Sequence, residues 1–265
     1  MVEQKDETRQ VIEMADAHCH LDLIGDYNLI SNSILNGVRT IITNGVDTKS
    51  NMKALELADG KHIFPMIGID PEHAMKIGAG NLDKELEFNL NLARQNVGRI
   101  AGIGEIGLDY KIVTKKAGVE RQTMVFGSFL DLAIELDVPV SVHARNAIGD
   151  VLGMLEDRGV QKAHLHYFEG GEAEAKRAEK LGCMISVPPL ESGKRARAIK
   201  VIPTENLMVE SDAPVVGDSP SAVQSSIGMI ATATKGRFED IAWATANNAK
   251  RFFNIRKLLS TRLMR

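Results

Sequence analysis

The feature that most constrains this chain is the alternation of short β-type runs with amphipathic helical stretches along its length. Residues 125–137, VFGSFLDLAIELD, carry apolar side chains near positions i, i+3, i+4 and i+7, as a helix covering a sheet does. Strands that alternate with helices are parallel and joined by crossovers. The predicted strands are residues 11–17, 38–43, 62–69, 99–105, 138–143, 162–167, 183–187 and 207–211.

Eight such units fit either a closed barrel or an open, doubly wound sheet. The length of 265 residues suits one large domain, and about 250 residues is typical of a single (β/α) barrel. No linker or exact repeat divides the chain, so we expect one domain over residues 1–265, with 238–255 as a terminal helix pair outside the barrel. Counting units does not choose between the two architectures.

Polar residues at the ends of the predicted strands favour the closed barrel over the open sheet. His18 and His20 close the first strand, and both imidazoles point the same way because strand residues alternate faces. Four further strands end in a possible metal ligand. The carboxyl ends of all strands meet at one face of a barrel, whereas an open sheet spreads them along an edge. We therefore predict a (β/α)8 TIM barrel with a metal site whose candidate ligands are His18, His20, Glu105, His143, His166 and Asp212.

Residues 102–107, GIGEIG, match the G-x-G-x-x-G pattern of a dinucleotide-binding turn. Such a turn leads directly into a helix and is followed by an acid about 20 residues on. Here the next residues, LDYKIVTKKAGVE, predict an irregular loop, and the motif lies in the fourth unit. We therefore reject a redox function and expect the glycines to let the backbone pass closely around Glu105.

The motifs DAHCHLD, GIGEIGLDY, VHAR, HYFEG and ESDAP occur in the order seen in TatD-like metal-dependent deoxyribonucleases, a branch of the amidohydrolase superfamily. The resemblance spans most of the chain, from Asp16 to the segment TANNAKRFF. It implies two divalent ions, one on His18, His20 and Asp212, the other on His143 and His166, with Glu105 bridging them. Such ions activate water and stabilise developing charge, and Asp212 is the expected general base. Imidazole and carboxylate ligands suit Zn²⁺ or Mn²⁺, and Mg²⁺ fits where waters complete the sphere.

Substrate contacts are expected from residues around this centre. Arg145 should face the cavity, where its guanidinium can hold a phosphate in a bidentate manner. Where the family usually carries G-[IV]-H-P-H, this chain has GIDPEHA, so Asp70 and Glu72 replace the histidines and His73 comes one residue later. Two acids repel an anionic phosphodiester, unless His73 compensates or the acids pair with Arg145 or Lys111. We expect Asp70, His73 and Arg145 to contact the substrate.

Three other polar positions have structural interpretations. His164 precedes His166 by two residues and is predicted to be a buried, hydrogen-bonded histidine and not a seventh ligand. Asp16 stands in the same relation to His18 and is expected to support it from behind. The basic run SGKRARAIK, which contains Arg195, is interpreted as a solvated helix face.

These observations favour a metal-dependent hydrolase of phosphoester bonds, with DNA as one substrate. Two alternatives stay open: hydrolysis of a C–N or carboxylic-ester bond in a small molecule, and a metal-binding barrel without turnover. The net charge of −3 provides no basic face for non-specific nucleic-acid binding. The polar N-terminus and the absence of a long apolar run predict a cytoplasmic protein without a membrane span. No protein partner is indicated.

Overall fold

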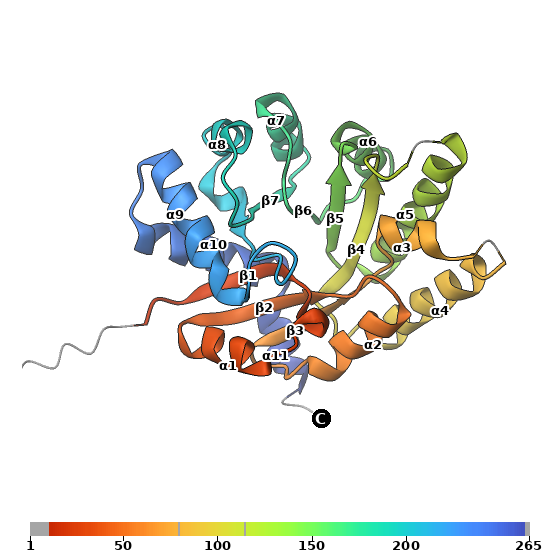
Figure 1. Cartoon of the computed structure of the whole chain (residues 1–265), viewed down its shortest axis with the longest axis horizontal. Coiled ribbons are helices and arrows are strands. Elements are labelled where there is room, and N and C mark those ends of the chain that lie inside the picture. Colours follow the sequence, from red (N-terminus) through yellow and green to blue (C-terminus); the bar gives the residue numbers. More distant parts are fainter. Residues whose placement is uncertain (1–10, 79, 114, 263–265) are drawn as a thin grey trace, which may run out of the picture.

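Eight parallel strands form one sheet in the order β1 to β8, and each strand is hydrogen-bonded to the next one along the chain. The structure is a computed structural model and describes residues 11–78, 80–113 and 115–262. Figure 1 shows the strands curving round a common centre with the helices flanking them. The strands are β1 Met14–Cys19, β2 Val38–Asn44, β3 Ile63–Ile67, β4 Gly102–Asp109, β5 Val140–Arg145, β6 Ala163–Leu165, β7 Met184–Val187 and β8 Leu207–Val209.

Helices connect successive strands and cover the outer face of the sheet (Figure 1). Their starting points follow local chemistry, as α2 illustrates. The Asp47 carboxylate accepts the Ser50 N–H at 2.7 Å, and the Ser50 hydroxyl accepts the Asp47 N–H at 2.9 Å, which is a capping box. The helices are α1 Tyr27–Leu35, α2 Thr48–Leu57, α3 Pro71–Lys76, α4 Leu82–Gln95, α5 Lys116–Leu136, α6 Ile148–Asp157, α7 Glu172–Lys180, α8 Gly193–Ile199, α9 Val223–Thr234, α10 Phe238–Phe252 and α11 Ile255–Arg262, with 3-10 turns η1 Leu21–Leu23, η2 Thr204–Asn206 and η3 Pro220–Ala222.

Backbone hydrogen bonds between the end of β1 and the segment just past β8 join the last strand to the first. The Asp212 N–H donates to the His18 carbonyl at 3.0 Å, and the His20 N–H donates to the Ala213 carbonyl at 2.7 Å. These bonds bring the β8 side against β1 and complete the (β/α)8 barrel, which confirms the predicted fold. They also fix His18, His20 and Asp212, three of the candidate ligands, relative to one another.

An apolar cluster fills the barrel interior at the end opposite the carboxyl face, and the C-terminal segment is part of this cluster. Phe64 and Met66 of β3 pack there with Ala246 of α10, and with Phe253 and Ile255 where α10 meets α11. Burying one such side chain contributes about 1.5–3 kcal/mol. The prediction that this segment packs outside the barrel is therefore wrong for its last residues, because Phe253 and Ile255 close the end of the barrel opposite the carboxyl face.

The strand β4 is longer towards its carboxyl end than predicted, and its glycines explain why. A Cβ at Gly104 would lie 2.8 Å from Ser141 Cβ on β5. Gly107 has φ +144°, and a Cβ there would lie 2.0 Å from the His143 carbonyl oxygen. Glycine therefore lets β4 run against β5 through the whole motif. Glu105 consequently lies within the strand and not at its end, and the irregular loop begins after Asp109.

The strands β6 and β8 are shorter than predicted. They end at Leu165 and Val209, so His166 and Asp212 lie on the loops that follow. Asp212 has a left-handed backbone conformation, with φ +47°. Such a conformation is uncommon for a residue other than glycine, and it turns the chain over the carboxyl face of the barrel.

Two sequence-based expectations concern a membrane span and the cellular location of the protein. Among the helices of the described residues, none is long and apolar enough to cross a membrane. The polar segment 1–10, which entered the prediction of a cytoplasmic protein, lies outside the described residues, so that prediction stays a prediction.

Candidate metal centre

The six predicted ligands converge at the carboxyl face of the barrel around Glu105. His18 lies on β1, Glu105 on β4 and His143 on β5, while the other three lie on loops directly after a strand. All are buried except His143, whose side chain is 22% exposed. The two carboxylate oxygens of Glu105 divide the remaining residues into two groups.

The first group faces Glu105 Oε2. His18 Nε2 lies 3.3 Å and His20 Nε2 lies 3.4 Å from this oxygen. Asp212 Oδ1 completes the group, 3.5 Å from His20 Nε2 and 4.0 Å from His18 Nε2. Two imidazoles and two carboxylates thus surround one small volume.

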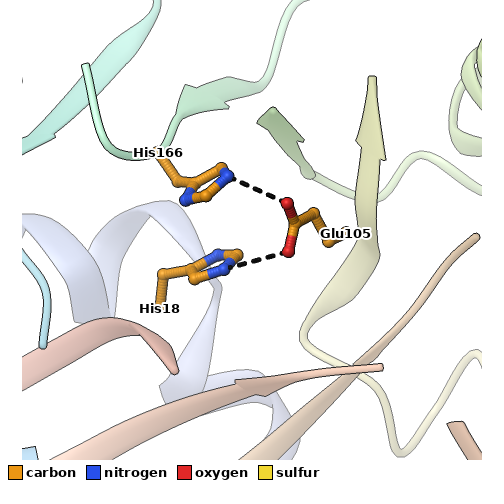
Figure 2. Close-up of side chains that lie close together, drawn as sticks. All are labelled: His18, Glu105 and His166. Carbon is orange, nitrogen blue, oxygen red and sulfur yellow. Dashed lines mark hydrogen bonds and ion pairs between the residues drawn. The ribbon is translucent and has the colours of Figure 1, made fainter. Parts of the chain in front are cut away.

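The second group faces Glu105 Oε1. His143 Nδ1 lies 2.9 Å and His166 Nε2 lies 3.1 Å from this oxygen, and the two nitrogens are 3.1 Å apart. Figure 2 shows Glu105 reaching His166 with one oxygen and His18 with the other. The His18 and His166 rings are stacked with their centroids 3.9 Å apart, so the two groups are adjacent.

The spacing and chemistry of the first group fit a cation. Ligand atoms bound at about 2.0–2.1 Å to one tetrahedral zinc ion lie about 3.3 Å apart. Three of the four nitrogen-to-oxygen distances in this group, at 3.3, 3.4 and 3.5 Å, match this value, and the fourth, from His18 Nε2 to Asp212 Oδ1, is 4.0 Å. His18 Nε2 is also buried without a hydrogen-bond partner among the described residues. A buried polar atom without a partner destabilises the fold, and a bound cation would supply that partner.

The far nitrogens of two imidazoles are held so that the near nitrogens face Glu105. His20 Nδ1 lies 3.0 Å from the Asn44 carbonyl oxygen, to which it donates. His143 Nε2 lies 3.3 Å from Asp109 Oδ2. A partner of this kind selects the tautomer whose other nitrogen is free to bind a metal.

Asp109 is a site residue that the sequence analysis missed. It is the last residue of β4 and is 4% exposed. It also pairs with Arg145, whose Nη1 lies 3.7 Å from Asp109 Oδ2. It follows Glu105 by four residues and shares its face of the strand, but the sequence predicts an irregular loop there, so its position became clear only from the extended β4.

The charge states within the centre follow from burial and from these contacts. Burial disfavours the charged form of Glu105, but the charge of His166 and hydrogen bonds from His143 and His166 hold its pKa well below the usual range. Burial and the neighbouring His166 lower the pKa of His18 to about 4. Glu105 is therefore an anion and His18 a neutral imidazole, which are the forms that bind a metal.

Two other imidazoles hold protons more tightly. Burial opposes their charge, but hydrogen bonds to carboxylates prevail. Asp212 and Glu105 raise the pKa of His20 to about 9. Asp109 and Glu105 raise the pKa of His143 to about 10. A cation must displace these protons to bind.

Behind the centre lie the polar residues expected to support it. Asp16 Oδ1 accepts the Ser211 N–H at 2.9 Å and the His18 N–H at 3.3 Å, and burial raises the pKa of Asp16 to about 7. His164 is fully buried and hydrogen-bonded, as predicted. Burial and the neighbouring His18 and His166 hold its pKa well below the usual range. Burial and the charge of Asp212 raise the pKa of Glu210, which the sequence analysis did not consider, well above its usual range.

A cleft opens above the centre. A cavity of about 340 Å³ is lined by Glu105 and Asp212 together with Asp70, Glu72 and His73. A second cavity of about 220 Å³ shares part of this lining, and Arg145 lines both. Volumes of a few hundred cubic ångströms suit small ligands. The predicted substrate contacts thus lie on the wall of the cleft.

The acids of this wall do not take the partners considered from the sequence. Glu72 pairs with Lys76 at 2.6 Å. Asp70 Oδ1 accepts the His73 N–H at 2.6 Å and caps α3. Burial and the charge of Glu105 raise the pKa of Asp70 to about 7. The His73 ring is itself engaged, with Nε2 2.8 Å from Glu85 Oε1.

Arg195 corrects another interpretation, because it is 5% exposed and not part of a solvated helix face. Its guanidinium donates to the Phe168 carbonyl at 2.9 Å and the Leu190 carbonyl at 2.7 Å, and it lies 5.1 Å from the Tyr167 ring centroid. The arginine therefore ties α8 to the loop that carries His166. Charge patterns alone do not reveal such backbone contacts.

Comparison with known proteins identifies the family of this chain. The family model described as TatD related DNase matches residues 15–254. Human deoxyribonuclease TATDN3 is 26% identical over 272 residues, covering 94% of this chain and 97% of that protein. The uncharacterized metal-dependent hydrolase YabD of Bacillus subtilis is 28% identical over 260 residues, covering 91% and 98%. The crystal structure of YJJV, a TatD homologue from Escherichia coli K12, shares the fold with a TM-score of 0.81 at 24% identity, covering 92% and 99%. Because the family model spans most of its length, the chain belongs to the TatD related DNase family of metal-dependent hydrolases.

Proposed function

We propose that this protein hydrolyses phosphodiester bonds, with DNA as the substrate class, at a centre of two divalent cations. The observation that carries the proposal is the division of the site by Glu105. Its Oε2 faces two imidazoles within 3.4 Å, and its Oε1 faces two others within 3.1 Å. A carboxylate between two groups of nitrogen ligands is the arrangement that a bridged pair of ions requires.

In this proposal each group holds one ion, and Glu105 holds both. Two such ions, which we take to be Zn²⁺, Mn²⁺ or Mg²⁺, supply Lewis acidity at the scissile phosphorus and lower the pKa of the attacking water. The first ion is held by His18, His20 and Asp212, and the second by His143 and His166.

The chain's own residues then take distinct roles. Asp212 lines the cleft and accepts the proton of the attacking water, for which it needs only hydrogen-bond reach. Arg145 stands at the rim with its side chain 40% exposed, and turns from Asp109 towards a substrate phosphate. Asp70 and His73 line the same cleft and limit which substrates enter.

DNA is proposed as the substrate class because relatives are named deoxyribonucleases. The acids of the wall support a second candidate, a neutral or cationic small molecule with a C–N or carboxylic-ester bond. Asp70 and Glu72 repel a polyanion, although Lys76 offsets the charge of Glu72 and burial raises the pKa of Asp70 to about 7, whereas such a substrate tolerates both acids.

A substrate panel with metal-loaded protein separates these functions. Cleavage of bis-p-nitrophenyl phosphate or single-stranded DNA, abolished in Asp212→Asn, supports the proposal. Glu72→Gln is the matched control, because it removes an acid from the same cleft without touching a proposed ligand, and it should stay active. Cleavage of only amides or lactones selects the second candidate. A protein that binds two ions and cleaves nothing is a metal-binding barrel, and the hydrolytic proposal then fails.

A further inference from the structure

A line of buried hydrogen bonds runs from the candidate ligand His18 to Glu210, a residue with no part in the proposed reaction. Its intermediate members are Ser141 on β5, His164 on β6 and Ser186 on β7, which we call the Ser–His chain. All five residues are 0% exposed. Because bulk water does not reach these groups, their polar atoms must find partners within the protein.

The links are continuous. His18 Nδ1 lies 3.1 Å from Ser141 Oγ, and this oxygen lies 3.2 Å from His164 Nδ1. His164 Nε2 lies 2.7 Å from Ser186 Oγ. The Ser186 hydroxyl donates to Glu210 Oε2 at 2.5 Å. Four links therefore connect a nitrogen of a candidate ligand to a carboxylate.

The number of available protons allows only two directions in which all four hydrogen bonds can form. A serine hydroxyl and a neutral imidazole each have one proton to donate, so all links point towards Glu210 or all point towards His18. When Glu210 accepts, His18 donates from Nδ1, and its Nε2 lone pair faces Glu105 and Asp212. In the opposite order the proton lies on Nε2, which then cannot bind a metal. A cation at His18 Nε2 therefore requires an ionised Glu210 that accepts, whereas the protonated Glu210 that burial favours without a cation would donate to Ser186 and give the opposite order.

We propose that Glu210 is a positioning residue of the metal centre. As the accepting end of the Ser–His chain, it holds the His18 proton on Nδ1 and leaves Nε2 free for a cation. The inference rests on the proposed metal site and adds to it a residue that touches neither ion nor substrate. Asp109 and the Asn44 carbonyl act on single imidazoles directly, whereas Glu210 acts through three other side chains.

Glu210→Gln tests this because it preserves the shape of the side chain and reverses the direction of the hydrogen bonds in the Ser–His chain. Glu210 Oε1 accepts the Tyr167 N–H at 2.7 Å, so the glutamine must place its amide oxygen there. Its amide nitrogen then faces Ser186 and donates to it, and every link reverses. We expect zinc affinity at the His18 group to fall about 10- to 100-fold, the range for losing support behind a ligand. The ion held by His143 and His166 should bind as in the wild type.

Two measurements on the full chain give the answer. Calorimetric titration with Zn²⁺ alone reports the affinity and number of ions. Nitrogen NMR of isotopically labelled histidines reports which His164 nitrogen carries the proton. We expect Nε2 in the zinc-loaded wild type and Nδ1 in zinc-free Glu210→Gln, in which no cation holds the His18 proton on Nδ1, and a merely structural role of Glu210 would not set this proton position. Glu174→Gln is the matched control, because that carboxylate also accepts a backbone N–H, from Gly171 at 2.8 Å, but lies outside the chain.

Ser186→Ala supplies an independent variant. It removes the hydroxyl that links His164 to Glu210 and so interrupts the Ser–His chain. Adding Glu210→Gln in its background should therefore change zinc affinity no further. Unchanged zinc affinity and an unmoved His164 proton in Glu210→Gln overturn the inference and leave the proposed function standing. If that variant does not fold, wild-type affinity in Ser186→Ala overturns the inference equally. A wild-type chain that binds no zinc rejects the proposed metal centre, and this inference with it.

Discussion

Replacing Glu105 by glutamine tests the centre most directly, because this side chain is the only one of the six candidate ligands that faces both groups. Its oxygens lie 2.9–3.4 Å from four imidazole nitrogens. Glutamine has nearly the same shape but no charge, and one of its two polar atoms is a donor. We therefore expect Glu105→Gln to weaken both ions, whereas Asp212→Asn weakens chiefly the ion at His18 and His20.

The expected size of the effect follows from the loss of one unit charge. At about 4 Å and an effective dielectric constant of 20, two unit charges interact by about 4 kcal/mol. A factor of ten in affinity corresponds to about 1.4 kcal/mol, so each ion should bind about a thousand-fold more weakly. A divalent ion increases the Coulomb energy, while the remaining amide oxygen offsets part of the loss.

Calorimetric titration and metal analysis after dialysis measure this loss. Wild type should retain two ions per chain, Asp212→Asn one and Glu105→Gln none at the same free metal concentration. Glu72→Gln should retain both, and circular dichroism should show that all variants are folded. The bridging role is refuted by a folded Glu105→Gln protein that retains two ions, or that loses only one.

Three further predictions concern pH, substrate and stability. His20 and His143, with pKa values raised to about 9 and 10, are protonated at neutral pH without metal, so cations displace protons when they bind. The affinity for the cation should therefore rise up to about tenfold per pH unit for each proton released, until the pH reaches these pKa values. Titration in buffers of different ionisation enthalpy measures the protons, and a pH-independent affinity contradicts this. Arg145→Lys should raise KM for a phosphodiester about tenfold with little change in kcat, from the loss of one charge-assisted hydrogen bond; an unchanged KM removes Arg145 from substrate binding. Phe253→Ala should lower the free energy of unfolding by about 3–5 kcal/mol in urea titrations, and a loss below about 1 kcal/mol would show that Phe253 does not close the barrel.

Much of the fold and the ligand set was predictable because their signals are local. The alternation of strand and helix patterns requires parallel strands, and the two-residue spacing of His18 and His20 puts them on one face. The sequence pattern predicts Glu105 at the end of its strand, and the structure corrects this. Glycines 102, 104 and 107 continue the strand to Asp109 because β5 passes too close for a side chain at Gly104 or Gly107.

Other features were not predictable because they depend on residues far apart in the chain. The basic run around Arg195 indicates a solvated helix face, yet its guanidinium finds two backbone carbonyls from other segments. The acids Asp70 and Glu72 were visible as departures from the family pattern, and their contacts are local, because Glu72 pairs with Lys76 one helical turn further on and Asp70 caps α3 at the His73 N–H. The contact of Arg195 with the Phe168 carbonyl depends instead on how loops pack over the closed barrel, and no sequence spacing encodes that.

The sequence by itself determined the barrel, the chemical types of the ligands and the end of the barrel where they gather, because strand periodicity and strand order are properties of neighbouring residues. Only the tertiary structure decided which oxygen of Glu105 faces which imidazoles, that Asp109 holds His143, and that Glu210 reaches His18 through the Ser–His chain. Those relations join strands that are separated by up to about 190 residues. Hydrogen bonds across such separations depend on atomic positions that are set only when β8 closes against β1.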